Sequence, residues 1–262
     1  MIATQASNLI EGPPCDVIRW GPVSHTHSQK SQLRELPPWI AASAQIKTEE
    51  TAAILGSLWR GIPTNPLAIP KNPSKRYYKK FSKYFYSSYF FKNLYKSIVL
   101  TSIFHERLSQ FDSFIDLGSG SAPFSTAISI RQHLREVSLV DRSKSHLGIG
   151  KKILRKTSKA LKIKSVISPI EDCILDFSYP IISSYLFCEL IDEKVDFSNI
   201  IEKSKFLLII DNSNTIARIE AEFGQSGDFK SGQIEFSIQS SVSSLIEGSS
   251  GRFSYILFDR FC

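Results

Sequence analysis

The sequence contains little cysteine, and its cysteines are widely spaced. They stand at Cys15, Cys173, Cys188 and Cys262. No two of them form a Cys-x-x-Cys pair, and none has the spacing to histidine that builds zinc or iron–sulfur sites. We therefore expect no metal site, and we expect reduced, mostly buried thiols of the kind found in cytoplasmic proteins.

Long apolar runs are also missing. No run of about 18 uncharged apolar residues occurs, so the sequence predicts no membrane-spanning helix and no membrane partner. The first residues include Glu11 and Asp16 and lack a basic start followed by an apolar block, so we expect no secretory signal. With 262 residues, 42% of them hydrophobic and 22% charged, the composition predicts an ordinary globular protein with a cytoplasmic location.

Acidic residues are absent between Glu50 and Glu106, and the net charge of +7 is therefore concentrated there. Within this interval, residues 71–96 interleave lysines with tyrosines and phenylalanines. Cations neutralise phosphates and aromatic rings stack on unpaired bases, so the mixture favours RNA binding. The candidate RNA-binding residues are Lys75, Arg76, Lys79, Lys80 and Lys83. Aromatic residues at helical spacing also suit an ordinary core, which is the alternative interpretation.

A second group of basic residues recurs at helical spacing further along the chain. It comprises Lys152, Arg155, Lys156, Lys159 and Lys162, with Ile153, Leu154, Ala160 and Leu161 predicted to face inward. This basic strip is a further candidate for RNA contact, and a solvated helix face is its alternative.

The chain divides into three parts by pattern. Residues 1–37 show no sustained periodicity and predict a loosely ordered arm. Residues 38–105 predict a helical, basic and aromatic substrate-docking region, in which 38–60 form one or two short helices with Thr48 as a possible N-cap. Residues 106–262 predict the domain that carries the chemistry.

In that last part, short apolar runs alternate with amphipathic segments. The predicted strands are 113–117, 136–141, 164–168, 180–187, 205–211, 232–242 and 251–261. Helices are predicted over 123–134 and 145–162. Such alternation predicts an α/β fold with a doubly wound, Rossmann-like, mostly parallel seven-stranded sheet and an antiparallel C-terminal strand, preceded by the N-terminal helical extension.

A glycine-containing turn follows the first predicted strand. The dinucleotide fingerprint requires a third glycine where this chain has Pro123. Read instead as D-x-G-x-G-x-A, residues 116–122 resemble the first motif of class I S-adenosylmethionine-dependent methyltransferases, and the resemblance extends over 111–262. It implies S-adenosylmethionine as cofactor, with Asp116, Gly118, Ser119 and Gly120 around its amino-acid end; a purely structural tight turn is the alternative.

The resemblance assigns further cofactor-binding residues. It implies that Asp141, at the end of the next strand, accepts the ribose hydroxyls and that Arg142 lies near the adenine. Asp141 can equally serve as a helix N-cap for the segment beginning at Ser143. Where the family usually has an acid near the adenine amino group, this chain has Pro169, so Glu171 or Asp172 is the substitute; both also suit an ordinary solvated loop.

The acceptor is less well defined by sequence. The signature of amino-group methylation is absent after the fourth strand, and the context of Cys188 does not match the nucleophilic cysteine of pyrimidine methyltransferases, which favours a packed thiol. Segments 83–100 and 183–190 resemble methyltransferase-like proteins of the small ribosomal subunit, without the cysteine cluster of that family.

We therefore predict an S-adenosylmethionine-dependent methyltransferase acting on RNA, with ribosomal RNA as one candidate. Two alternatives are a small-molecule methyltransferase with a helical lid, and a non-catalytic binding module whose cofactor pocket is filled by Pro123 or Phe124. No catalytic base is assigned, because transfer from a sulfonium mainly requires positioning of the acceptor.

Overall fold

A single mixed sheet organises the molecule. The computed structural model describes residues 33–35, 38–59, 90–224, 229–237 and 250–261. Its strands are β1 (Leu33–Glu35), β2 (Ser113–Leu117), β3 (Glu136–Asp141), β4 (Lys162–Ile167), β5 (Ile181–Ser184), β6 (Phe206–Asp211), β7 (Phe229–Ser237) and β8 (Ser250–Asp259). They lie in the order β1-β7-β8-β6-β5-β2-β3-β4.

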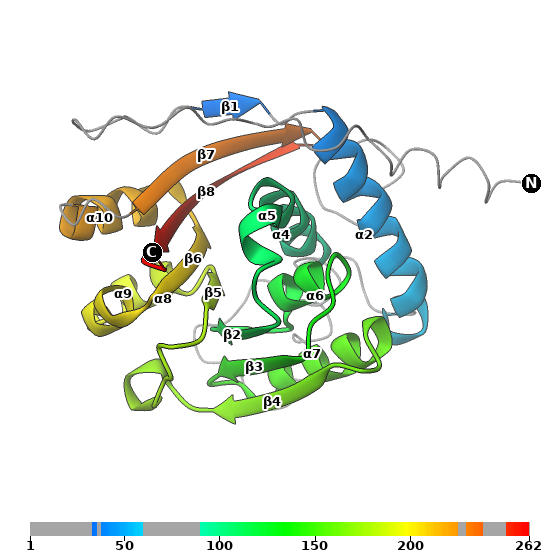
Figure 1. Ribbon diagram of the computed structural model, residues 1–262, viewed down its shortest axis with the longest axis horizontal. Coiled ribbons are helices and arrows are strands. Elements are labelled where there is room, and N and C mark those ends of the chain that lie inside the picture. Colours follow the sequence, from blue (N-terminus) through cyan, green and yellow to red (C-terminus); the bar gives the residue numbers. More distant parts are fainter. Residues whose placement is uncertain (1–32, 36–37, 60–89, 225–228, 238–249, 262) are drawn as a thin grey trace, which may run out of the picture.

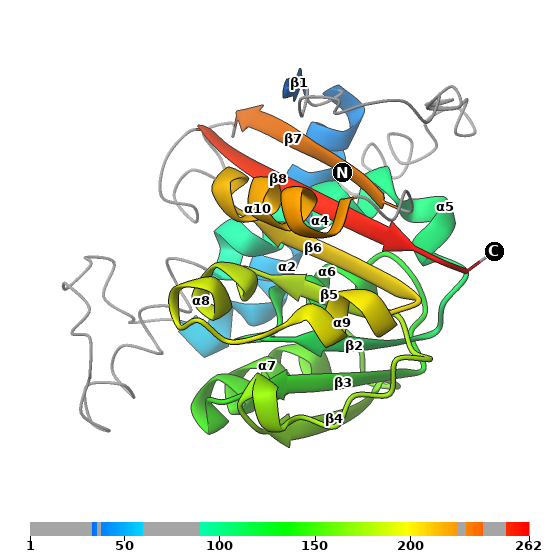
Figure 2. The ribbon, with the colours of Figure 1, turned by 90° about the vertical axis from the view of Figure 1, so that its left-hand side faces the viewer.

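Strand direction confirms the predicted architecture. Strands β2 to β6 pair in parallel, and β8 is antiparallel to both neighbours, β6 and β7. The arrow of β8 accordingly points opposite to that of β7 in Figure 2. Beyond the seven predicted strands, β1 pairs in parallel with β7 through Leu33 and Gln233. This short strand lies where the sequence predicted only a loosely ordered arm, because three residues are too few to show an alternating pattern.

Burial explains which strands are central. All residues of β2 and β6 are buried, as expected for parallel strands covered on both faces. Strand β4 lies at the edge and is largely exposed. There Lys162 and Lys164 both form ion pairs with Glu136 of β3, and charged residues of this kind discourage further strand pairing at an open edge.

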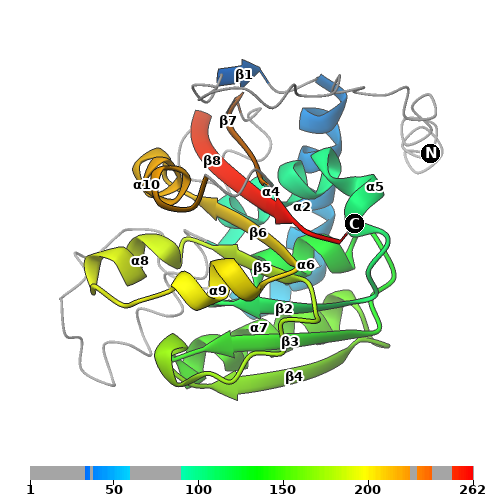
Figure 3. The same ribbon diagram turned by 60° about the vertical axis from the view of Figure 1, so that its left-hand side comes forward.

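Helices cover both faces of the sheet (Figure 1). One face carries α2 (Pro38–Trp59), α4 (Phe91–Ile103), α6 (Pro123–Ser129) and α7 (Lys144–Thr157), with α5 (His105–Leu108) following α4. The other carries α8 (Phe187–Asp192), α9 (Ser198–Lys203) and α10 (Ser213–Phe223), which stand together on one side of the strands in Figure 3. Each face has its own cluster of buried apolar side chains.

The N-terminal helices share a core with the sheet. Ile40 and Leu55 of α2 and Leu94 of α4 belong to the same buried cluster as Phe124 of α6 and Leu139 of β3. In the described residues, the region predicted for substrate docking is thus packed onto the domain that follows it.

Three local expectations were wrong. Helix α2 is one continuous helix, and Thr48 lies inside it, where its hydroxyl donates to the Ala44 carbonyl at 2.7 Å instead of capping a second helix. Ala160 is exposed, because α7 ends at Thr157 and the chain turns into β4. Helix α6 ends at Ser129, well before the predicted residue 134.

Candidate functional site

The turn after β2 has an unusual backbone. Gly118, Gly120 and Ala122 have φ angles of 64°, 50° and 60°, in the left-handed region that glycine adopts most easily. A Cβ on Gly118 would lie 2.8 Å from the Cβ of Leu186, whereas a Cβ on Gly120 would meet nothing within 4 Å. The turn is therefore packed at its first glycine and open at its second.

Asp116 faces inward from the end of β2. Its side chain is 1% exposed, and Oδ2 accepts hydrogen bonds from the Ser125 amide at 3.2 Å and the Ser125 hydroxyl at 2.5 Å. Burial raises the pKa of Asp116 to about 7, with a smaller contribution from the charge of Asp141, while the bonds from Ser125 oppose the rise. The carboxyl group thus holds the start of α6 against the turn, and direct contact with a cofactor stays a prediction.

Asp141 connects the end of β3 to the same turn. Its Oδ2 accepts from the Gly120 amide at 2.8 Å and its Oδ1 from the Ser143 amide at 2.7 Å. Helix α7 is capped by Ser143, whose hydroxyl accepts from the His146 amide, so Asp141 is not the N-cap residue. Each carboxylate oxygen of Asp141 has a lone pair left to accept a further hydrogen bond.

Arg142 reaches across the carboxyl edge of the sheet. Its guanidinium donates to both carboxylate oxygens of Glu193, at 2.9 and 3.0 Å, and to Glu189 at 3.2 Å. Arg142 follows β3 and the two glutamates lie at α8, after β5, so the ion pairs span the end of β2, which lies between these strands. Burial raises the pKa of Glu189 and the Arg142 charge opposes this rise.

Glu171 and Asp172 stand on a short 3-10 turn, η3 (Ile170–Asp172), that follows β4. Both are exposed. The loop before this turn lies beside β3, because the Ser168 amide donates to the Asp141 carbonyl at 3.3 Å. The structure therefore brings this segment to the edge that carries Asp141, while the choice between the two acids stays a prediction.

A second group of polar residues gathers where β5 and β6 end. The resemblance stated from sequence included segment 183–190, but no residue of this group was assigned to a site. Tyr185 follows β5 with a φ of 58°, and its hydroxyl accepts a hydrogen bond from Lys96 of α4. Asp211 ends β6 fully buried, and its Oδ2 accepts from the Cys188 amide at 3.1 Å. A signal was present for Asp211 alone, since it ends an apolar strand as Asp141 does.

Cys188 is held as a thiol. Its Sγ donates to the Tyr185 carbonyl at 3.4 Å. Burial, followed by the negative charge of Asp211, raises the pKa of this thiol to about 12. A thiolate nucleophile is disfavoured in such surroundings, in keeping with the expectation of a packed thiol.

The candidate RNA-binding residues Lys75, Arg76, Lys79, Lys80 and Lys83 lie outside the described residues. The basic strip at Lys152, Arg155, Lys156, Lys159 and Lys162 is exposed along α7 and the start of β4. Among the residues with a described structure, no group of three or more histidines, cysteines, aspartates or glutamates has the arrangement of a metal site. Nor does any helix in that part of the chain have the length and apolar character needed to cross a membrane.

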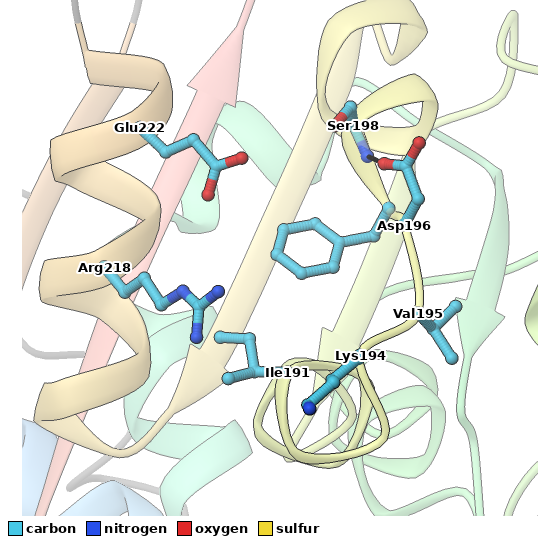
Figure 4. A pocket seen from close by; sticks show the side chains of 8 residues that line it. Ile191, Lys194, Val195, Asp196, Ser198, Arg218 and Glu222 are labelled. Atoms are coloured by element: carbon cyan, nitrogen blue, oxygen red, sulfur yellow. Dashed lines mark hydrogen bonds between the residues drawn. The ribbon is translucent and has the colours of Figure 1, made fainter.

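A surface hollow lies elsewhere, between α10 and the segment joining α8 to α9 (Figure 4). It is lined by Ile191, Lys194, Val195, Asp196, Phe197, Ser198, Arg218 and Glu222. Its lining includes no residue that the sequence predicted for the cofactor or for RNA.

The turn has features that suit a polar ligand. The Ser119 hydroxyl is buried, with 2% of the residue exposed, and finds no hydrogen-bond partner in the described part of the protein. Space is open at Gly120, and Asp141 retains acceptor capacity beside it. An unpaired buried hydroxyl next to an open backbone and a carboxylate fits a polar ligand at this place.

Comparison with known proteins bears on the fold. No family model matches the sequence, and no curated protein matches it. Among solved structures, a suspected RNA methyltransferase from Pyrococcus horikoshii is similar, with 14% identity and a TM-score of 0.45 over 64% of this chain and 83% of that one. The METTL16 methyltransferase domain has 14% identity and a TM-score of 0.43, over 84% and 82% of the two chains.

A suspected S-adenosylmethionine-dependent methyltransferase from Methanococcus maripaludis has 17% identity and a TM-score of 0.41, over 62% of this chain and 78% of that one. At these identities and TM-scores the likeness assigns no activity to this chain. The sheet of this chain carries its glycine turn after the central strand β2, and its antiparallel strand β8 lies between β6 and β7. The chain therefore has the doubly wound, Rossmann-like sheet with an antiparallel C-terminal strand that the sequence predicted.

Proposed function

We propose that this protein is an S-adenosylmethionine-dependent methyltransferase that acts on RNA. The observation that carries the first part is the joint placement of the open turn at Gly120, the unpaired Ser119 hydroxyl and the Asp141 carboxylate. In this proposal the turn receives the amino-acid end of the cofactor and Asp141 accepts its ribose hydroxyls. The bound cofactor supplies an activated methyl group, and the protein positions the acceptor and excludes water.

The RNA part of the proposal is supported by charge. The interval without acidic residues, from Glu50 to Glu106, includes α4, whose Lys96 contacts Tyr185 directly after β5. The exposed basic strip lies on the later part of α7 and ends at Lys162, at the start of β4, so it lies away from the carboxyl edge of the sheet. In the described residues, Lys92 and Lys96 of α4 bring positive charge to this edge, and such charge suits a polyanionic acceptor.

The non-catalytic alternative predicted that Phe124 or Pro123 fills the cofactor pocket. Phe124 is fully buried in the cluster formed with α4 and β3, and Pro123 begins α6 at its first position. Neither placement is at the open side of Gly120. This observation favours the enzyme over the binding module.

Calorimetric titration with S-adenosylmethionine and S-adenosylhomocysteine tests the cofactor site. We expect micromolar binding by the wild type and loss of at least tenfold in affinity for Asp141→Asn, which keeps one carbonyl oxygen for the turn but removes the charge. Asp176→Asn is the matched control, because Asp176 is an exposed loop aspartate that binds only its neighbour Ser178. A folded wild type that binds neither compound would contradict the proposal.

A methyl-transfer assay tests the acceptor. Tritiated S-adenosylmethionine incubated with total RNA from cells lacking the protein should label RNA, and the label should resist protease and yield to ribonuclease. Label that instead stays in a small-molecule fraction would point to the alternative with a helical lid.

A further inference from the structure

Lys96 is a buried lysine on the face of α4 that meets the end of β5. It is 7% exposed, its Nζ donates to the Tyr185 hydroxyl, and the same Nζ lies 4.5 Å from the centre of the Tyr185 ring. Tyr185 itself is half-buried, so the pair is not sealed within the core. A lysine in such a place is uncommon, because burial of an ammonium group without a counter-charge is costly.

The hydrogen bonds of Lys96 are incomplete. An ammonium group has three donors, and in the described residues Tyr185 supplies its one hydrogen-bond acceptor. Asp211 is the nearest source of negative charge, but its oxygens accept from the Cys188 and Asn212 amides. Burial and the positive charge of Lys92 lower the pKa of Lys96 to about 8, so the group is still mainly charged at neutral pH.

The pair stands next to the proposed cofactor turn. Tyr185 precedes Leu186, and Leu186 is the side chain that packs on Gly118. The Tyr185 backbone is fixed there in the left-handed region, and its amide donates to the Ile210 carbonyl of β6 at 2.8 Å. Non-glycine residues held in this region are strained, and such strain gathers at functional sites.

We propose that Lys96 and Tyr185 form an anion-binding pair on the acceptor side of the turn, and that the pair takes a phosphate oxygen of the RNA acceptor. The inference rests on the proposed function and specifies the part of the substrate that this site holds. The phosphate would occupy the free donors of Lys96 and accept from the Tyr185 hydroxyl. Lys96 and Tyr185 are thereby positioning residues, since they bind the substrate away from the transferred methyl group.

Phosphate is favoured over other anions by the surroundings of the pair. Lys92 lies one helical turn before Lys96 and adds positive charge to the same face of α4. Both lysines belong to the segment 71–96, which contains no acidic residue. A strand of RNA that contacts Lys92 would therefore bring a phosphate towards Lys96 and the end of β5.

The pair is tested by fluorescence anisotropy with a fluorescein-labelled 12-nucleotide oligouridine, titrated at several salt concentrations. We expect Lys96→Met to lower affinity about fivefold or more and to reduce the slope of log affinity against log salt by about 0.7, the value for one phosphate contact on a single strand. Tyr185→Phe should lower affinity two- to fivefold, and Lys96→Arg should restore part of the loss. Lys203→Met on α9 is the charge-matched control, because Lys203 is exposed on the opposite face of the sheet.

If Lys96 only stabilised the fold, Lys96→Met would lower the melting temperature and leave oligouridine affinity unchanged. Under the proposal, the melting temperature of Lys96→Met should shift little, because an apolar residue of similar length is tolerated at a buried site. Unchanged oligouridine affinity in Lys96→Met, with or without a shift in melting temperature, overturns the proposal. A small aromatic acid, 4-hydroxybenzoate, is the second probe. If its binding depends on Lys96 and oligouridine binding does not, the proposal is also overturned, because the pair then binds a small acidic acceptor.

Binding of S-adenosylhomocysteine tests the proposed function independently of the phosphate contact. Lys96→Met should bind S-adenosylhomocysteine as tightly as the wild type, because Lys96 lies on the acceptor side of Leu186. Absence of S-adenosylhomocysteine binding in the wild type contradicts the cofactor assignment and leaves the oligouridine result to decide the phosphate contact.

Discussion

Leu186 packs directly against Gly118, so the exit of β5 and the turn after β2 meet at one point. The contact leaves no room for a side chain, since a Cβ on Gly118 would lie within 3.0 Å of three atoms of Leu186. Gly120, two residues later, has a similar positive φ but faces open space. Gly118 is therefore required by packing against Leu186, whereas Gly120 leaves the backbone accessible to a ligand.

This difference predicts unequal effects of alanine at the two positions. Gly118→Ala should lower the free energy of unfolding by about 2–5 kcal/mol, because the left-handed backbone and overpacking against Leu186 both contribute. Gly120→Ala should lower it by about 1–2 kcal/mol from the backbone alone. Denaturant unfolding measures both, and equal losses would contradict the packing at Gly118.

The glycine variants also distinguish an effect on stability from an effect on cofactor binding. Gly120→Ala should remain folded and yet lose S-adenosylhomocysteine affinity, because its methyl group projects into the space assigned to the cofactor. Retention of wild-type affinity by a folded Gly120→Ala would mean that the ligand does not approach the backbone there.

Asp116 makes stability depend on pH. The folded protein raises the pKa of this carboxyl from 3.8 to about 7, mainly through burial, so it retains a proton that an unfolded aspartate releases. The stabilisation of the folded state by protonated Asp116 is fully present below about pH 4 and is lost as the pH rises towards 7. Relative to the wild type, Asp116→Asn should therefore gain up to about 4 kcal/mol between pH 4 and pH 7.

Thermal or denaturant unfolding at several pH values checks this expectation. Glu202→Gln is the control, because Glu202 is exposed on α9 and should leave the pH profile unchanged. A parallel shift of the Asp116→Asn profile, without a change of slope, would mean that Asp116 is already ionised in the folded state.

The sheet and its turn could be predicted from sequence because their signals are local. Strands 113–117 and 136–141 coincide with β2 and β3, since each is an apolar run with an acid at or next to its last position, followed by a turn. Contacts between distant segments leave no such signal. The pairing of Lys96 with Tyr185 joins residues 89 positions apart, and the pattern around Lys96 suggests an ordinary basic helix.

Single carboxylates show the same limit. Asp116 lies one residue before the end of β2 and Asp141 ends β3. The sequence assigned both to the cofactor, but the fold turns Asp116 towards Ser125 of α6 and leaves Asp141 beside Gly120. Which way a strand-end side chain turns depends on the packing of the helix that follows. For Asp116 that helix is α6, whose Ser125 offers two donors.

The Arg142 bridge should contribute little to stability. The side chains of Arg142, Glu189 and Glu193 are 59%, 57% and 47% exposed, and ion pairs at such exposure contribute at most about 1 kcal/mol. Arg142→Ala should therefore shift the melting temperature by no more than about 4 °C. If Arg142 lies near the adenine, the same variant should lose about three- to tenfold in S-adenosylhomocysteine affinity, measured by calorimetry.

The control for this variant is Arg155→Ala on the exposed face of α7, which should change neither quantity. Unchanged affinity in Arg142→Ala would restrict this arginine to the ion pairs with α8.

Cys188 should be chemically inert. Because burial and Asp211 raise the pKa of its thiol to about 12, the thiolate fraction at pH 8 is about 1 in 10,000, against about one quarter for an ordinary cysteine. Alkylation by iodoacetamide at pH 8, followed by mass spectrometry of the peptide containing Cys188, should proceed at least 100-fold more slowly than for free cysteine. Cys188→Ser should retain S-adenosylhomocysteine binding and methyl transfer, since a packed thiol takes no part in the chemistry. Rapid alkylation together with loss of transfer in Cys188→Ser would instead identify a nucleophile, and would require Asp211 to be protonated or turned away from Cys188 in the working enzyme.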